Sequence, residues 1–292
     1  MKIETKIAEI CGRENITADI AVVDNYKIIC DFTYGVPRNT LFQVASISKP
    51  FFAALVMRLC DAGREIDGGL LDLLRHRGGA NVDGFDGYNS GDKIPSNAEI
   101  LRGKGNSPTV KISTNKRYKY SGGGYQIAQE IITQKFGDFC DLMRAWIFDP
   151  LKIKHWGYFT SYPNDVMVAS KDYKIYPEFA AAGLHITARG VADFGIAIMR
   201  SLSRDGFLST QSAHLMTDKF ASPHAVGFRA TEKSFWHGGV NNEFFSHVIF
   251  SKNGRGVVIL TASNNEKVFT KIEQTVRAEL NWQDFEINEF SL

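Results

Sequence analysis

The sequence SISKPFFAALVMRLC, residues 46–60, is a nearly continuous apolar stretch that begins with a serine and a lysine three positions apart. Pro50 comes early enough to lie in a first helical turn, where its missing N–H removes no hydrogen bond. We therefore predict a buried helix with Ser46 at its start. The S-x-x-K spacing would place a hydroxyl and an amine one turn apart on the same helix face, close enough to share a proton.

The S-x-x-K pattern is weak by itself, because three such tetrapeptides occur, starting at Ser46, Ser90 and Ser113. Ser90 and Ser113 lie in polar surroundings that indicate surface loops, whereas Ser46 opens the apolar stretch. A buried lysine is costly unless it has a partner or a task, and burial would lower its pKa toward that of a useful base. We therefore take Ser46 and Lys49 as a candidate nucleophile and base. A plain helix-capping role for Ser46 is compatible with the same pattern.

Two further segments carry candidate chemistry. Residues 118–125 read YKYSGGGY, so Tyr120 precedes glycines that would let the backbone approach a ligand. A phenol near a cationic lysine can have a lowered pKa and act as a base, although the segment also fits a simple helix-entry turn. Residues 236–240 read WHGGV, and glycines at a strand edge suit an oxyanion hole or pairing with a strand-like substrate. Alone, that segment could be a bulge.

The two ends of the chain predict one sheet. The first dozen residues have helical spacing, and residues 19–32 suggest two short strands joined at Asp24-Asn25. Residues 245–250 and 256–262 are β-rich runs joined by an Asn-Gly turn, followed by a helix over residues 265–280. The middle of the chain predicts helices, at residues 125–136, 139–148 and 189–202.

These elements predict an α+β fold in which an antiparallel sheet is built from both chain ends and flanked by terminal helices, with a mainly helical region inserted. We expect one domain over residues 1–292, with its α/β part at about 1–45 and 190–292 and its helical part at about 46–189.

Composition excludes several classes of partner. The 34 Lys and Arg residues nearly balance the 32 Asp and Glu residues, so a net charge of +2 gives no field that favours nucleic acid or an anionic membrane. The N-terminus lacks the features of a secretory signal, and the four cysteines have no paired spacing. We expect free thiols and a cytoplasmic location, or a periplasmic or secreted one if a leader was trimmed. We expect no metal and no cofactor, and ordinary structural or surface roles for six scattered histidines: His76, His155, His185, His214, His224 and His247.

Taken together and in this order, the three segments resemble the serine β-lactamase and penicillin-binding-protein superfamily. The likeness is to the branch of class C β-lactamases, family VIII carboxylesterases and D-aminopeptidases. That branch uses S-x-x-K, then Y-x-N or Y-S-x, then K-T-G or H-x-G, which here read Ser46 to Lys49, Tyr120-Ser121-Gly122 and His237-Gly238-Gly239. The resemblance covers roughly residues 15 to 280 and implies a β-lactamase/transpeptidase-like fold.

The resemblance implies an acyl-enzyme mechanism. Ser46 would attack a carbonyl, Lys49 and Tyr120 would relay its proton, and the N–H groups of Ser46 and Val240 would hold the oxyanion. His237 would bind a substrate carboxylate or orient Tyr120, or serve only as a structural histidine. The flanking Gly238, Gly239 and Gly122 complete the candidate substrate-binding residues.

Two departures from the family pattern bear on the substrate. Gly122 replaces the asparagine that contacts the amide side chain in lactamases, and His237-Gly238-Gly239 replaces K-T-G. We therefore predict a carboxylesterase, or a D-amino-acid amidase or peptidase, acting on a small acyl substrate. The alternatives are a β-lactamase or DD-peptidase, an acyltransferase, and a non-hydrolysing sensor that binds a β-lactam or peptide. The sequence does not predict the oligomeric state.

Overall fold

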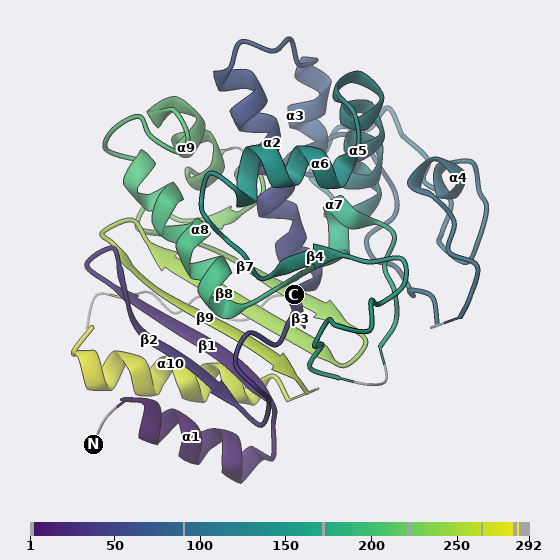
Figure 1. The fold of residues 1–292 in the computed structure, drawn as a ribbon. Helices are drawn as coiled ribbons and strands as arrows, with labels where there is room; N and C mark the ends of the chain where they lie inside the picture. The colour runs from purple at the N-terminus through teal and green to yellow at the C-terminus, as the bar shows by residue number, and fades with distance from the viewer. Residues whose placement is uncertain are drawn as a thin grey trace.

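A six-stranded antiparallel sheet forms the centre of the structure, a computed structural model that describes residues 3–89, 91–170, 173–220, 224–263, 265–282 and 285. Its strands follow the order β2-β1-β9-β8-β7-β6 (Figure 1). In that order their bounds are Lys27–Tyr34, Ala18–Asp24, Arg255–Ala262, Phe244–Ser251, Ser234–Asn241 and Arg229–Ala230. The first two strands come from the start of the chain and the other four from its end.

The pairing of β1 with β9 joins the two ends of the chain, with Ala18 opposite Thr261. This confirms the sheet predicted from the terminal segments. The turn between β1 and β2 lies one residue later than expected, because Asn25 and Tyr26 have φ values of 53° and 60°. Two left-handed residues in succession match the right-handed twist of the flanking strands.

The terminal helices cover one face of the sheet. Helices α1 (Ile3–Glu14) and α10 (Lys267–Leu280) lie side by side below the strands in Figure 1. Their inward side chains join one hydrophobic cluster with those of β1 and β9, including Ile7, Ile20 and Ile259. The predicted flanking helices are therefore confirmed.

Helix α8 (Ala188–Ser201) packs on the opposite face of the sheet, against β1 and β9. Gly195 permits the close approach, because a Cβ there would lie 2.0 Å from Cζ of Phe250 on β8. Above α8 in Figure 1 stands the helical part of the chain, which surrounds α2 (Ser48–Asp61). Its other helices are α3 (Gly68–Leu74), α4 (Asn97–Leu101), α5 (Gly122–Phe136), α6 (Phe139–Met143), α7 (Phe179–Ala182) and α9 (Thr210–Thr217).

Helix α2 is buried along nearly its whole length, as its apolar sequence predicts. Phe51 stacks on Phe194 of α8 with ring centroids 3.9 Å apart, and on Phe148 at 5.9 Å. Phe148 ends the wider π-helical turn η2 (Arg144–Phe148) that continues α6, within the single helix expected over residues 139–148. The aromatic stack ties α2 to the helix that lies on the sheet, so α2 is fixed relative to the strands.

Further features differ from the sequence-based expectations. Ser46 lies in a separate 3-10 turn, η1 (Ala45–Ile47), and α2 begins two residues later. Helix α5 starts at Gly122, earlier than expected, because the Ser121 side chain caps it by accepting from Gly124 N–H. A small three-stranded sheet, β3 (Phe42–Gln43), β5 (Leu184–Ile186) and β4 (Trp156–Tyr158), was not expected, since strands this short carry no readable period.

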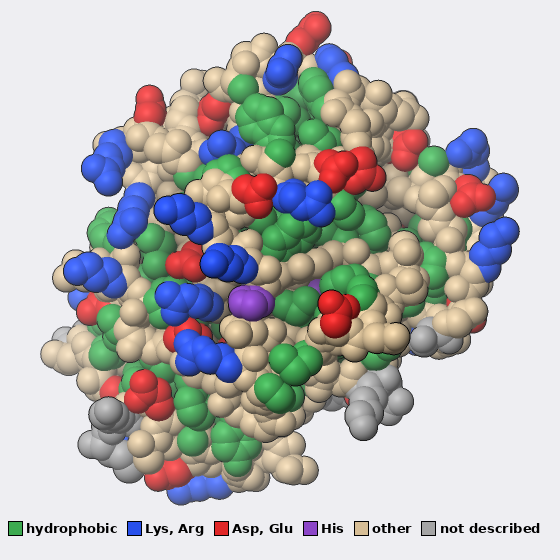
Figure 2. All heavy atoms as spheres, viewed as in Figure 1, with side chains coloured by type: hydrophobic (Ala, Val, Ile, Leu, Met, Phe, Trp, Pro, Cys, Tyr) green, Lys and Arg blue, Asp and Glu red, His purple; other side chains and the backbone are tan. Residues whose placement is uncertain are grey.

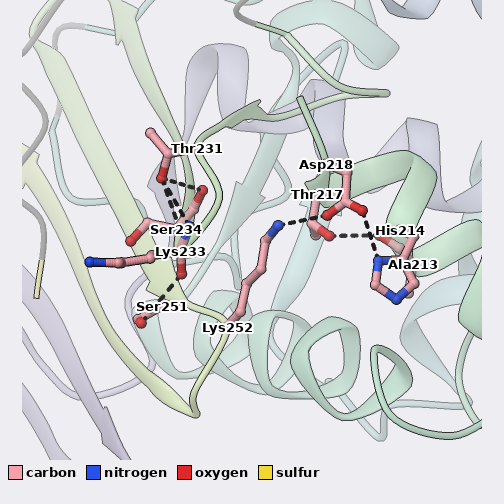
Figure 3. A network of polar contacts seen from close by, with 9 residues as sticks. All are labelled: Ala213, His214, Thr217, Asp218, Thr231, Lys233, Ser234, Ser251 and Lys252. Atoms are coloured by element: carbon pink, nitrogen blue, oxygen red, sulfur yellow. Dashed lines mark hydrogen bonds and ion pairs between the residues drawn. The ribbon is translucent and has the colours of Figure 1, made fainter. Parts of the chain in front are cut away.

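Helix α9 was also not expected, and a polar network joins its end to the main sheet (Figure 3). Lys252, in the turn between β8 and β9, donates to Asp218 at 2.6 Å. Asp218 follows the last residue of α9 and also contacts His214 Nδ1 at 2.9 Å. On the strand side, Thr231 Oγ1 accepts the backbone N–H of Ser234 at 3.1 Å, next to the start of β7.

Candidate active site

Ser46 and Lys49 form a close pair, as the S-x-x-K spacing predicts. Lys49 Nζ donates to Ser46 Oγ at 2.8 Å and to the carbonyl oxygen of Ala181 on α7 at 2.8 Å. The lysine is only 1% exposed. Burial lowers the pKa of Lys49 to about 7, although the Asp83 carboxylate offsets part of that shift. Near neutral pH the amine can therefore lose its proton and accept that of Ser46.

The turn that carries Ser46 is held rigidly. Ala45 has a φ of 48°, a left-handed conformation that is uncommon for a residue with a side chain. Ser48 Oγ donates to Ala45 O at 2.6 Å and accepts Leu184 N–H at 3.0 Å. Val44 N–H donates to Leu184 O at 3.0 Å. The unexpected small sheet therefore has a role, because its strand β5 fixes the turn that presents the serine.

Tyr120 completes the group of predicted catalytic residues. Its hydroxyl hydrogen-bonds with Ser46, and Lys49 Nζ lies 5.0 Å from its ring centroid. Burial raises the pKa of Tyr120, and neither the hydrogen bond with Ser46 nor the charge of Arg229 reverses that shift. The expectation of a lowered pKa is wrong, because burial outweighs the nearby cations. The phenol stays protonated and is suited to pass a proton on, rather than to serve as the resting base.

Strand β7 brings the glycine segment beside the serine. Strand β6 pairs only with Trp236 and Phe235, so within the described residues no strand covers the other edge of β7 from His237 onward. A Cβ at Gly239 would lie 2.4 Å from Val44 O and 2.6 Å from Ser246 Oγ. Only glycine allows β7 to pack this closely on the turn that precedes Ser46.

A cavity of about 370 Å³ opens over Ser46. Seven of the predicted site residues lie together in or beside it. Ser46, Tyr120, His237, Gly238, Gly239 and Val240 line its wall, and Lys49 lies buried next to the serine. The remaining lining residues are Asp83, Gly84 and Arg229. Sequence reasoning missed these three, because a single carboxylate or guanidinium in a loop or short strand has no spacing that marks it.

Gly122 does not line this cavity. It is buried, and a Cβ there would lie 2.7 Å from Cε2 of Phe85 and 2.9 Å from Asp83 O. Residues 83–85 therefore occupy the space into which a side chain at position 122 would extend. This explains why the asparagine of the lactamase pattern has no room here.

Three histidines pack around Tyr120. His237 Nδ1 donates to Gly238 O at 2.6 Å, while its Nε2 is buried and has no hydrogen-bond partner among the described residues. His76 Nδ1 accepts Ser121 N–H at 3.0 Å, and its ring centroid lies 4.3 Å from that of Tyr120. His224 packs 5.6 Å from Tyr120 and hydrogen-bonds with Tyr118. His76 and His224 thus pack beside Tyr120, a position that the sequence alone does not indicate.

Both His76 and His237 are neutral near pH 7. Burial lowers the pKa of each well below the ordinary histidine value, and the nearby Lys49 charge adds to the shift. A neutral His237 whose Nδ1 is the donor presents Nε2 as an acceptor. It is therefore placed to accept a hydrogen bond at the cavity rather than to attract a carboxylate by charge.

The competing S-x-x-K serines have different surroundings. Ser113 and Lys116 are both exposed, as expected of a surface loop. Ser90 lies outside the described residues, so its predicted loop position stays a prediction. Among the three tetrapeptides, the one at Ser46 combines a buried lysine with a serine that lines a cavity.

A second hollow, of about 360 Å³, is lined by Arg38, Lys152, Lys154 and Arg189 among others. Figure 2 shows Lys and Arg side chains gathered on this face over α8. Neither Ser46 nor Lys49 lines this second hollow.

Within the described residues, no group of three or more His, Cys, Asp or Glu side chains could hold a metal ion. No helix in the same residues is long and apolar enough to cross a membrane, and all four cysteines are free thiols.

Solved structures with the same fold include three bacterial and archaeal proteins. FmtA from Staphylococcus aureus matches with a TM-score of 0.75 at 15% identity, covering 99% of this chain and 90% of that one. The D-amino acid amidase from Ochrobactrum anthropi SV3 matches with a TM-score of 0.73 at 17% identity, covering 96% and 100%. The octameric penicillin-binding protein homologue from Pyrococcus abyssi matches with a TM-score of 0.72 at 15% identity, covering 96% and 77%. These likenesses confirm the predicted fold.

No curated protein matches the sequence at a significant level. The family model described as Beta-lactamase matches residues 12–281, which is nearly the whole chain. That match agrees with the resemblance carried by the three segments around Ser46, Tyr120 and His237. The chain therefore belongs to the beta-lactamase family and is a serine hydrolase.

Proposed function

We propose that this hydrolase works through an acyl-enzyme on Ser46. The observation that carries the proposal is the 2.8 Å contact between Ser46 Oγ and Lys49 Nζ, in surroundings that lower the pKa of the amine to about 7. A neutral amine at this distance is a general base in hydrogen-bond reach of its nucleophile.

In the proposed reaction, Ser46 Oγ attacks the substrate carbonyl while its proton passes to Lys49 Nζ. The oxyanion is held by the backbone N–H groups of Ser46 and Val240. Tyr120 then gives its hydroxyl proton to the leaving oxygen or nitrogen and regains one from Lys49. The bond to the leaving group breaks and an ester on Ser46 remains. Water attacks this ester along the reverse path, which releases the acid and restores the serine.

For the substrate, we propose a small ester or a D-amino-acid amide or peptide. The space at Gly122 is filled by residues 83–85, so no asparagine contact to a lactam amide can form there. The K-T-G lysine is replaced by a neutral His237. The likeness to the D-amino acid amidase gives further support.

A β-lactamase or DD-peptidase is the second candidate, because Arg229 lines the same cavity and a guanidinium is a good partner for a substrate carboxylate.

The test is intact-protein mass spectrometry after exposure to a fluorophosphonate and, separately, to a penicillin, with hydrolysis of p-nitrophenyl butyrate followed in parallel. We expect one fluorophosphonate adduct and ester cleavage in the wild type, and neither in Ser46→Ala. Ser113→Ala is the matched control and should behave as the wild type. Labelling that survives Ser46→Ala would refute the proposal, and a persistent penicillin adduct would favour the second candidate or a sensor. Transfer of the acyl group to added alcohols would identify an acyltransferase.

A further inference from the structure

Asp83 lines the cavity over Ser46, and hydrogen bonds hold its loop in place. Its carbonyl oxygen accepts Gly122 N–H at 3.1 Å, and that of Val82 accepts Gly123 N–H at 3.0 Å and Ser121 Oγ at 2.6 Å. These bonds attach the loop to the start of α5, directly after Tyr120. The loop therefore holds Asp83 at a set position relative to the catalytic tyrosine.

The Asp83 carboxylate has no hydrogen bond or ion pair within the described part of the chain, and its side chain is exposed. Its charge nevertheless reaches the catalytic pair. It opposes the lowering of the pKa of Lys49 by burial, and it adds to the raised pKa of Tyr120. A group attached next to the scissile carbonyl of a substrate would lie within the same range of this charge.

The charges of the cavity lining favour Asp83 as the binding position for a cation. Among the lining residues that the structure describes, Asp83 is the one acid. Arg229, on strand β6, also lines the cavity, and its positive charge would repel a cation. His237 is neutral, and the remaining lining residues carry no charge near pH 7.

Resting on the proposed function, we propose that Asp83 binds the ammonium group of an aminoacyl substrate. The site would thus take amino-acid esters, amides or short peptides with a free amino group in preference to neutral acyl esters. Asp83 would then be a specificity-determining residue that favours amino-acid substrates over small neutral esters.

Substrate binding would also affect the base. The negative charge of Asp83 favours the protonated form of Lys49, so an ammonium group placed beside Asp83 offsets that influence. Lys49 would then lose its proton more readily when the preferred substrate is bound. Recognition and activation of the nucleophile would be coupled through one carboxylate.

The experiment compares methyl esters that differ only at the charged group. Methyl 2-methylpropanoate carries a methyl group where the methyl esters of D-alanine and L-alanine carry an ammonium. Acid release is followed by pH-stat titration at a pH where the amino group is protonated. The variants are Asp83→Asn and, as matched control, Asp86→Asn, an exposed aspartate that does not line the cavity.

We expect the wild type to favour one alanine ester over the neutral ester by about tenfold or more in kcat/KM, as for a hydrogen bond between charged groups. Asp83→Asn should remove this preference, Asp86→Asn should retain it, and added salt should weaken it in the wild type. With the neutral ester, Asp83→Asn should shift the acid limb of the pH profile to lower pH, because the pKa of Lys49 falls when the negative charge is removed.

Two results would overturn this inference and leave the proposed function standing. One is labelling of Ser46 by the fluorophosphonate together with equal hydrolysis of the three esters by the wild type. The other is a preference for the alanine ester that survives Asp83→Asn. Absence of both labelling and ester hydrolysis would overturn the proposed function and this inference with it. Thermal unfolding of Asp83→Asn at the wild-type temperature would show that a loss of preference is not a loss of fold.

Discussion

Lys49 Nζ lies 2.8 Å from Ser46 Oγ, and the serine's turn and the lysine's helix are separate elements of the backbone. We predict that Lys49→Met, which keeps an unbranched side chain of similar length, lowers kcat by about 10²–10⁴, because Lys49 supplies the amine that contacts the serine hydroxyl. The rate of fluorophosphonate labelling, measured by mass spectrometry, should fall with it. Labelling at the wild-type rate would show that Lys49 is not the base.

The pH dependence of hydrolysis should follow the same lysine. Lys49 acts as a base only when it is neutral, and burial lowers its pKa to about 7. Activity on a neutral ester should therefore be low below that pH, rise through about pH 7 and level off above it. The measurement is kcat/KM across pH 5–9. A rise centred near the ordinary lysine pKa would mean that the amine is far better solvated than its burial indicates.

Tyr120→Phe removes the hydroxyl and keeps the ring, so it tests the role of the hydroxyl alone. The variant keeps the aromatic face near Lys49 but loses the hydrogen bond with Ser46 and the proton for the leaving group. We predict a loss in kcat of about 10²-fold or more, larger for amides than for activated esters, whose leaving groups need no proton. Equal losses on p-nitrophenyl and alkyl esters would assign Tyr120 a positioning role instead.

Much of this site could be predicted from local spacing. The three-residue separation of Ser46 from Lys49, together with the apolar stretch that it opens, predicts their proximity. The glycines at 238 and 239 indicate a close approach before its partner is known. The sheet built from both chain ends was predictable for the same reason: the alternation of strand residues and the turn residues are local patterns.

Other features depend on contacts that no local pattern encodes. Strand β5 is only three residues long, yet it fixes the turn at Ser46 through two hydrogen bonds made by Leu184. Asp83 reaches the cavity only because its loop is bonded to the start of α5. The direction of the pKa shift of Tyr120 is set by the depth of burial, which a sequence does not state.

His76 should act as a positioning residue for Tyr120. It has a φ of 58°, and its Nδ1 accepts Ser121 N–H at 3.0 Å. We predict that His76→Ala lowers kcat about tenfold, because that N–H is left unsatisfied and the ring no longer packs on Tyr120. His76→Asn should recover much of the loss, since asparagine tolerates the left-handed backbone and offers an acceptor oxygen.

The pH profile distinguishes this positioning role from proton transfer. His76 is neutral throughout the working range, because burial holds its pKa well below the ordinary value. Neither His76 variant should therefore remove a limb from the profile. The disappearance of a limb would place His76 in the proton path.

Gly239→Ala should break the contact between β7 and the serine's turn. The added Cβ would lie 2.4 Å from Val44 O, a backbone atom that cannot rotate away. We predict a destabilisation of about 1–3 kcal/mol in the free energy of unfolding and a large loss of activity, as the strand edge moves from Ser46. Gly84→Ala, which meets nothing within 4 Å, is the control for stability. Unchanged unfolding of Gly239→Ala would refute the close packing.

The joining of β1 to β9 has a consequence for the order in which the protein matures. During synthesis, Ser46, Lys49 and Tyr120 all emerge before β7 and β9 have been translated. The Ala18–Thr261 pairing spans most of the chain, and pairing between such distant segments is expected to form late in folding. We therefore expect a nascent chain to expose Ser46 before the strand edge of β7 lies beside it, and hydrolysis to begin only after release of the complete sheet.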